Sequence, residues 1–206
     1  MTPLGRIALG FDTSAAHCAA ALVLGDRVLA ERVEPMGKGQ AERLMGMLEE
    51  VLAEAGLGWD GLDALGVCTG PGNFTGTRIG VAAARGLALA LGIPAEGVGA
   101  AEALAEGRDV VVCLPAPRGQ VHAAWRGEVR TVAPGAPPEG WDAPLTGPAA
   151  NLLGGGRTVL PAPPIAVAVA RMAAERAAPG RPSPAPVYLR PADAAPPSDP
   201  PPRILA

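Results

Sequence analysis

The stretch IALGFDTSAAHCAAALVLGDRVLAERV, residues 7–33, decides the fold that the sequence predicts. Three apolar runs of strand length follow one another in this region: Arg6–Ser14, His17–Leu24 and Arg27–Val33. Gly25-Asp26, a turn signal, separates the last two runs. The stretch therefore predicts three consecutive strands, of which the first ends in Asp12-Thr13-Ser14 and the next two form a hairpin.

Helices and strands alternate after this opening. Between Gln40 and Ala55, apolar residues recur at helical spacing and glutamates fill the other side, which predicts an amphipathic helix. Ala64–Thr69 has the length and apolar character of a buried strand, and Asn73 can cap a second helix, Phe74–Leu91. Two short elements complete the order βββαβαβα: a strand closing at Val98 and a helix over Ala100–Ala105.

The second half of the chain carries weaker patterns. Three runs read as strands: Asp109–Leu114, Gln120–Arg126 and Glu128–Val132. Thr158–Leu160 is a further candidate strand, and Pro164–Ala178 is predicted to form a helix that begins with proline. The segment from Pro179 holds ten of the 24 prolines, so we expect it to be extended or disordered. Its apolar island, Pro186–Arg190, is a candidate for packing back on the body.

The composition and charge limit the function classes. Hydrophobic residues make up 49% of the 206 residues and aromatic residues 3%, so Ala, Leu and Val are expected to build the core. The net charge is −3 and no basic cluster exists, so a role on RNA would require another protein to hold most of the RNA. Cys18, Cys68 and Cys113 form no CxxC pair, and no apolar run reaches about 18 residues. These features predict a soluble, cytoplasmic protein with buried free cysteines and no membrane contact.

Two polar segments are candidate binding sites. Asp12-Thr13-Ser14, at a strand end, can hold a metal-bound nucleotide, but the same residues are common in plain turns. Residues 70–76, GPGNFTG, precede a helix and can bind an anion, but they also suit a tight strand-to-helix turn. No Lys follows these glycines, which excludes a Walker A loop.

Other catalytic constellations are missing from the sequence. His17 and His122 are the two histidines, and neither belongs to an HxxxH or HExxH pair, which excludes a helical zinc site. No G-x-S-x-G segment offers a nucleophile elbow for a serine hydrolase. We therefore assign no catalytic residue and no metal ligand, and we interpret both histidines as structural.

Four segments together resemble the bacterial TsaB (YeaZ) family. Residues 7–14, IALGFDTS, resemble the family's opening, and residues 70–88, with GPGNFTGTRIG followed by ARGLA, resemble its signature GPGSFTGxRIGxxxAKGLA. Residues 118–124, RGQVHAA, look like its RxxEVYxA segment, and residues 186–190, PVYLR, look like its PxYLR segment. The resemblance follows the whole chain in order and is strongest up to about residue 105.

The resemblance implies an α/β fold of the actin-like, Hsp70-like (ASKHA) type, with two lobes that each contain a mixed β-sheet and helices. Residues 1–106 would form a partner-binding N-terminal lobe, residues 107–178 a smaller, degenerate second lobe, and residues 179–206 a Pro-rich tail. Asp12, Thr13 and Ser14 would form a vestigial nucleotide site. The chain lacks the metal-binding His pair of the related TsaD-type proteins.

The resemblance also implies a non-catalytic role in making threonylcarbamoyladenosine next to the anticodon of tRNA. Family members bind a TsaD-type catalytic subunit through the N-terminal lobe and support it together with a TsaE-type ATPase. Homodimers through the same face are implied for the isolated chain. tRNA would be reached only through the complex, no cofactor of its own is expected, and ATP or ADP at the complex interface is left open.

Several positions depart from the family pattern. Asn73 replaces a Ser, and Gln40 stands where the family often has His. In the second half, Pro115 and Thr146 lie in segments where carboxylates are common in the family. Because these family carboxylates are missing, the sequence does not favour nucleotide binding by the second lobe.

The helix over Phe74–Leu91 is predicted to lie at the centre of the subunit interface, beside the Gln40–Ala55 helix. Arg78 and Arg85 are its only charges and lie seven residues apart on one narrow stripe, so a broad polar face is missing. Small residues would form a ridge for a partner, and methionines on the neighbouring helix would adapt to it. The candidate interface residues are Met45, Met47, Gly76, Ile79, Gly80, Ala83, Ala84 and Leu87. The alternative is a helix wholly buried inside this chain.

Two other function classes stay open. A stand-alone ASKHA kinase or ATPase would need a second phosphate loop and a catalytic Asp in the second lobe, and the sequence offers neither convincingly. A glycoprotease would need a metal or nucleophile set, which the sequence lacks. Nucleotide titration of the isolated chain, with and without a TsaD-type protein, distinguishes these classes.

We expect the isolated chain to bind tRNA weakly. Its 17 basic and 20 acidic residues form no basic stripe that could displace counterions from phosphates. Fluorescence anisotropy with tRNA at physiological salt should give a Kd above about 1 μM. A submicromolar Kd would contradict this prediction.

Overall fold

The predicted opening hairpins are confirmed in the computed structural model, which describes residues 5–154 and 156–189. Five strands form the first sheet: β1 (Ile7–Asp12), β2 (His17–Leu24), β3 (Arg27–Pro35), β4 (Ala64–Cys68) and β5 (Ala95–Val98). Their spatial order is β3-β2-β1-β4-β5. β1, β2 and β3 pair antiparallel, whereas β4 runs parallel to β1 and β5 parallel to β4.

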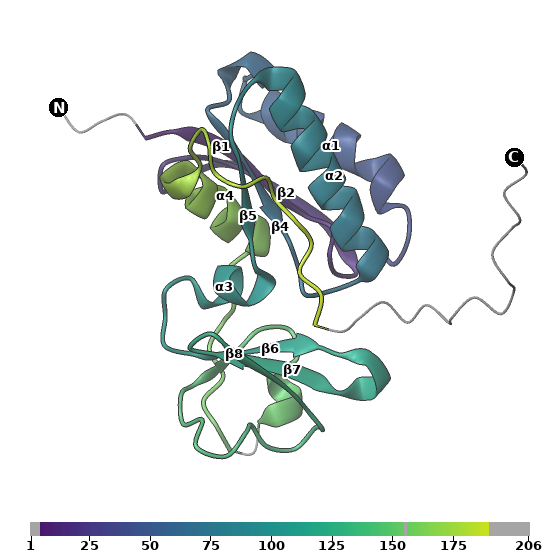
Figure 1. The fold of residues 1–206 in the computed structure, drawn as a ribbon, viewed down its shortest axis with the longest axis vertical. Coiled ribbons are helices and arrows are strands. Elements are labelled where there is room, and N and C mark those ends of the chain that lie inside the picture. Colours follow the sequence, from purple (N-terminus) through teal and green to yellow (C-terminus); the bar gives the residue numbers. More distant parts are fainter. Residues whose placement is uncertain (1–4, 155, 190–206) are drawn as a thin grey trace, which may run out of the picture.

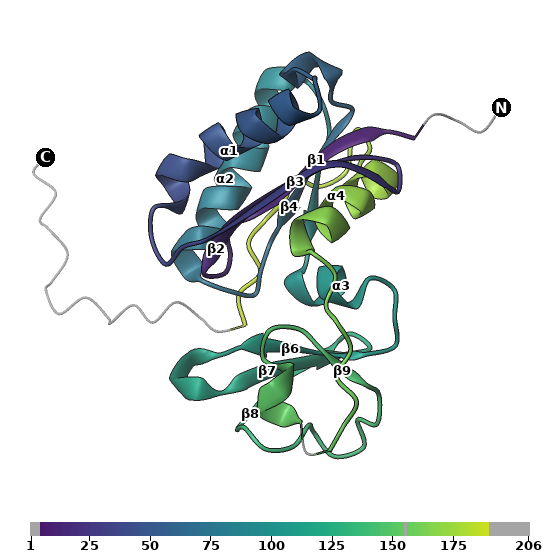
Figure 2. The same cartoon turned by 180° about the vertical axis from the view of Figure 1, so that it is seen from behind.

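Helices cover both faces of this sheet (Figures 1 and 2). α1 (Gln40–Glu54) and α2 (Phe74–Leu91) lie on one face, and α4 (Ile165–Arg176) lies on the other. Because side chains alternate across a strand, Leu9 and Phe11 of β1 join the core under α1 and α2, whereas Ala8 faces α4. The sheet thus presents large side chains to α1 and α2 and small ones to α4.

Two glycines bring α4 unusually close to the sheet. A Cβ atom on Gly10 would lie 2.4 Å from the backbone nitrogen of Ala170, and one on Gly66 would lie 2.7 Å from the backbone oxygen of Val169. The helix itself is rich in Ala and Val, so its backbone can approach the central strands. This close approach explains why the short helix α4 is almost fully buried along its middle.

A second, smaller sheet forms the other lobe. Its strands are β6 (Val111–Pro115), β7 (Val121–Trp125), β8 (Glu128–Val132) and β9 (Leu145–Thr146), in the order β8-β7-β6-β9. The described residues also contain 3-10 turns at Trp59–Gly61, Pro117–Gly119 and Ala150–Leu153. Helix α3 (Ala100–Ala105) joins the lobes, because one apolar cluster contains its Leu104, Val112 of β6 and Met172 of α4.

The structure corrects the predicted extent of the second lobe. We expected residues 107–178 to form it, but α4 packs on β1, β2 and β4 of the first sheet. The sequence predicted a helix over Pro164–Ala178 without indicating which sheet it covers. The candidate strand Thr158–Leu160 is an isolated bridge between Val159 and Leu145, and the short strand β9 was not predicted.

The Pro-rich segment returns along the first lobe. It contains no helix or strand between Ala177 and Leu189, as predicted for an extended segment. Arg181 forms an ion pair of 2.9 Å with the buried Glu96 of β5, and Val187 donates a backbone hydrogen bond of 2.8 Å to the Thr69 carbonyl. In Figure 1 this segment, drawn in yellow, crosses the first lobe beside β5. Arg190, the last residue of the predicted apolar island, lies outside the described residues.

The cysteines behave as the sequence predicts. Cys18, Cys68 and Cys113 are all buried and unpaired. None of the helices in the described ranges combines the length and apolar character needed to cross a membrane.

One added methyl group should distinguish the tight face of the sheet from an open helix surface. Gly10→Ala places its Cβ against backbone atoms of α4 that cannot rotate away, so the free energy of unfolding should fall by about 3 kcal/mol. Gly86→Ala, on the exposed side of α2 with no atom within 4 Å, should gain about 0.5–1 kcal/mol. Urea unfolding measures both values. Equal stability of the two variants would show that α4 does not press on β1.

Candidate functional site

The Asp12-Thr13-Ser14 turn is closed by contacts within the chain. The Asp12 side chain is 0% exposed. Its Oδ1 atom accepts a hydrogen bond of 2.7 Å from the Ser14 backbone N–H, and its Oδ2 atom lies 2.8 Å from Nε2 of His17. Both carboxylate oxygens therefore already have partners from β2 and the turn.

The environment of Asp12 keeps its carboxylate ionised. Burial alone raises the pKa of this group, but hydrogen bonding and charge attraction from His17, together with hydrogen bonds from Ser14, lower the pKa below the ordinary value of 3.8. His17 lies at the start of β2, and its side chain is 23% exposed. The sequence indicated a structural histidine here, but it did not identify Asp12 as its partner.

The Gly-rich loop before α2, residues 70–76, is in direct contact with the Asp12-Thr13-Ser14 turn. Thr13 Oγ1 donates a hydrogen bond of 2.7 Å to the Gly76 carbonyl, and the Asn73 N–H donates one of 2.5 Å to the Ser14 carbonyl. A Cβ atom on Gly72 would lie 2.2 Å from the Ser14 oxygen, and one on Gly76 would lie 2.0 Å from the Thr13 oxygen. Both positions therefore require glycine. The residues suit a tight strand-to-helix turn.

The polar side chains at the end of β1 are engaged in contacts within the protein. Asp12, Thr13 and Ser14 are all buried, and their side chains are hydrogen-bonded inside the protein, with Ser14 Oγ lying 3.5 Å from Cys68 Sγ. Burial raises the pKa of Cys68, so its thiol stays neutral. Across residues 5–154 and 156–189, no group of three or more His, Cys, Asp or Glu side chains could hold a metal ion.

The structure places half of the predicted interface residues inside the protein. Gly76, Gly80, Ala84 and Met47 are buried in the first lobe. Gly80 faces Thr13 Oγ1 and Val67, so the ridge of small residues serves the contact between α2 and its own sheet. Ile79, Ala83 and Leu87 are partly buried against the core under α1 and α2, and Met45 is exposed.

A different stripe of α2 faces outward. Arg78, Ala82, Arg85 and Leu89 are exposed and recur at helical spacing. Leu89 is 87% exposed, which is extreme for a large apolar side chain. On the neighbouring α1, the exposed stripe contains Glu42, Met45 and Glu49. We call these two stripes together the α1–α2 face.

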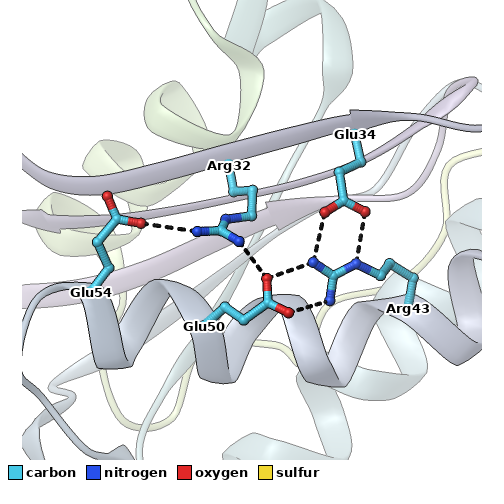
Figure 3. A network of polar contacts seen from close by, with 5 residues as sticks. All are labelled: Arg32, Glu34, Arg43, Glu50 and Glu54. Carbon is cyan, nitrogen blue, oxygen red and sulfur yellow. Dashed lines mark hydrogen bonds and ion pairs between the residues drawn. The ribbon is translucent and has the colours of Figure 1, made fainter.

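An ion-pair network fixes α1 against the edge strand β3 (Figure 3). Arg43 of α1 forms two hydrogen bonds to Glu34 of β3, of 2.7 and 2.6 Å. It forms two more, of 2.9 and 2.6 Å, to Glu50, which lies about two turns further along the same face of α1. Arg32 of β3 joins Glu50 and Glu54 to the same network. These hydrogen bonds lower the pKa values of Glu34 and Glu50. Bidentate geometry makes this network more rigid than an isolated surface pair.

One polar cluster was not predicted from the sequence. The guanidinium of Arg78 lies 3.8 Å from the centre of the Phe74 ring, and its Nε donates a hydrogen bond of 2.8 Å to the hydroxyl of Tyr188. The Phe74 and Tyr188 rings lie 5.1 Å apart. Both motifs that supply these residues were recognised in the sequence, but nothing in their spacing indicated that they meet.

The fold and this closed turn define the class of the protein. A five-stranded sheet in the order β3-β2-β1-β4-β5, flanked by helices and followed by a smaller lobe, is the architecture of actin-like, Hsp70-like (ASKHA) proteins. The solved structure of YeaZ from Pseudomonas aeruginosa superposes with a TM-score of 0.65 at 26% identity, covering 89% of this chain and 100% of that one.

Sequence comparison narrows the class to a family. The profile of the family described as TsaD: tRNA N6-adenosine threonylcarbamoyltransferase matches residues 31–134, just over half of the chain. The TsaB protein of Haemophilus influenzae is 38% identical over 91 residues, which cover 42% of this chain and 36% of that protein. The TsaB protein of Bacillus subtilis is 35% identical over 119 residues, covering 55% and 52%. This chain belongs to the TsaB (YeaZ) family.

The alignments cover only part of this chain and only part of each relative. The matched part of the chain spans 30–52% of the length of these curated relatives. The names of the Haemophilus influenzae and Bacillus subtilis TsaB proteins assign those two proteins to tRNA threonylcarbamoyladenosine biosynthesis.

Asp12→Asn is expected to flatten the acid side of the pH–stability profile. Because the folded-state pKa of Asp12 is lowered, its ionised form stabilises the fold above the unfolded pKa, and this contribution is lost as pH falls through the folded value. Wild type should therefore lose stability more steeply than the variant below about pH 4. Near neutral pH the variant should be less stable by about 1–3 kcal/mol.

Urea unfolding at a series of pH values measures this difference. Asp60→Asn, at an exposed position, is the matched control and should keep the wild-type profile. An Asp12→Asn profile parallel to that of wild type would contradict the prediction.

Proposed function

We propose that this chain is a non-catalytic partner subunit in tRNA threonylcarbamoyladenosine biosynthesis. In this role it binds a TsaD-type catalytic subunit and supports it together with a TsaE-type ATPase. Membership of the TsaB family supports the pathway, since relatives with that name are described by it. The observation that carries the partner role is the exposed stripe of α2, which contains Leu89 and no acidic residue.

The chemistry of the α1–α2 face supports a protein partner. Apolar Met45, Ala82 and Leu89 lie among a few charges, and an exposed apolar side chain gains stabilisation only when another surface covers it. α2 contributes exposed arginines, whereas α1 contributes exposed glutamates. Such a face is complementary to itself about a two-fold axis, so we also propose homodimers of the isolated chain through the same surface.

The role of nucleotide and tRNA follows from the closed turn and the charge. The side chains at the end of β1 are partnered inside the protein, so we propose that ATP or ADP, where the complex uses it, is held outside the Asp12-Thr13-Ser14 segment. With a net charge of −3, the chain would meet tRNA only through the complex. The unpaired cysteines suit a reducing compartment, and we place the complex in the cytoplasm.

Leu89→Asp is expected to weaken association with the TsaD-type protein of the source organism by at least about tenfold, because it replaces an anchoring apolar side chain by a charge. Leu152→Asp, which changes an exposed leucine of the second lobe, is the matched control and should bind like wild type. Calorimetric titration gives the Kd values, and circular dichroism confirms that both variants are folded.

The outcomes distinguish whether the chain binds the TsaD-type protein at all from which surface it uses to do so. Absence of binding by wild type, with both proteins folded, would overturn the proposed function. Unchanged binding by Leu89→Asp would move the interface away from α2. Gly80→Glu is unsuited to this test, because Gly80 is buried against Thr13 and the variant is expected to unfold.

A further inference from the structure

Arg78 is held in one conformation by two aromatic side chains from opposite ends of the sequence. Its guanidinium lies over the Phe74 ring at 3.8 Å from the ring centre, within the range of a cation–π contact. Its Nε donates to Tyr188 Oη over 2.8 Å, although 110 residues separate the two in the chain. An arginine on a helix surface normally samples many rotamers, so these two contacts remove much of its conformational freedom.

Tyr188 is itself fixed by the extended segment that carries it. The N–H of Val187 donates to the Thr69 carbonyl at the end of β4, and Pro184 is buried against Gly97 of β5. These contacts place the Tyr188 hydroxyl beside the first turns of α2. The extended segment thus acts as a support for one arginine of the α1–α2 face.

Within residues 5–154 and 156–189, the two terminal nitrogens of the Arg78 guanidinium have no carboxylate partner. The Tyr188 hydroxyl oxygen accepts the hydrogen bond from Nε–H. Two parallel N–H groups at the end of a guanidinium match the two oxygens of a carboxylate. Phe74 and Tyr188 leave 43% and 44% of their surfaces exposed, so a partner that covers them would also exclude water from this ion pair.

We propose that Arg78, positioned by Phe74 and Tyr188, binds a carboxylate side chain of the partner subunit. This inference rests on the proposed partner role and names one contact that confers specificity. Tyr188 is a positioning residue, because it acts on the partner through Arg78. Arginine and tyrosine together are the residue types that most often dominate binding energy at protein interfaces.

The surroundings favour a protein carboxylate over an RNA phosphate. Val187, Tyr188 and Leu189 add exposed apolar surface next to Phe74. Binding an RNA backbone requires several basic side chains along the surface. Arg78 and Arg85 are the only charged residues of α2. A single arginine within an apolar rim instead suits one acidic side chain of a folded partner.

A double-mutant cycle with the TsaD-type protein of the source organism tests the proposal. Arg78→Gln should raise the Kd by about ten- to a hundredfold, the effect of losing a charged hydrogen-bonded pair. It should also make the Kd less dependent on salt. Tyr188→Phe, which keeps the ring and removes the hydroxyl, should raise the Kd by about two- to tenfold. In the Arg78→Gln background, Tyr188→Phe should have no further effect, because the arginine that it positions is gone.

Arg27→Gln, at an exposed position of β3, is the control and should bind like wild type. Wild-type affinity in Arg78→Gln overturns the inference and leaves the proposed function intact. Fully additive effects of Arg78→Gln and Tyr188→Phe overturn the positioning role of Tyr188. No binding by wild type overturns both the inference and the proposed function. If Arg78→Gln leaves protein binding unchanged but weakens tRNA binding, the site recognises phosphate and the carboxylate assignment is wrong.

Discussion

The fold depends on the contact between the Gly-rich loop and the end of β1. Gly72 and Gly76 meet the carbonyl oxygens of Ser14 and Thr13 at distances that no Cβ atom could tolerate. Asn73 adds a second constraint, because its side chain accepts the Gly76 N–H and so fixes the first turn of α2. The loop and strand together determine how α2 is rotated on the sheet.

That rotation decides which residues of α2 reach the surface. With Gly76, Gly80 and Ala84 turned inward, the stripe of Arg78, Ala82, Arg85 and Leu89 must face outward. The same contact fills the space at the end of β1, beside Thr13 and Ser14. One set of backbone contacts therefore packs the end of β1 and also determines which stripe of α2 faces outward, and we propose that this stripe meets the partner.

The sequence predicted the local elements well and their assembly less well. The bounds of β2, α2, α3 and β8 agree with the predicted ranges, because turn signals, an Asn cap and helical or alternating periodicity are local features. The position of α4 on the first sheet depends on Gly10 and Gly66. Both glycines lie far from α4 in the sequence, since even Gly66 precedes the helix by about 100 residues. Periodicity cannot report such a contact. The small residues of α2 were identified correctly, but small side chains permit close approach by any neighbour, and here that neighbour is the chain's own Thr13.

The Asp12–His17 pair gives the buried carboxylate at the end of β1 a partner from within the chain. A buried carboxylate at a strand end requires a positive or hydrogen-bonding partner, and leaving it alone would cost several kcal/mol. In this chain the imidazole of His17 and the Ser14 N–H supply those partners from neighbouring residues. The turn, and with it α2, is therefore held in place by the protein alone. A face that is formed before the partner arrives loses little conformational entropy on binding, so its few anchoring side chains can contribute more of their interaction energy to affinity. In the role we propose, the family's strand-end aspartate acts in the fold, and it contributes to binding by keeping α2 fixed.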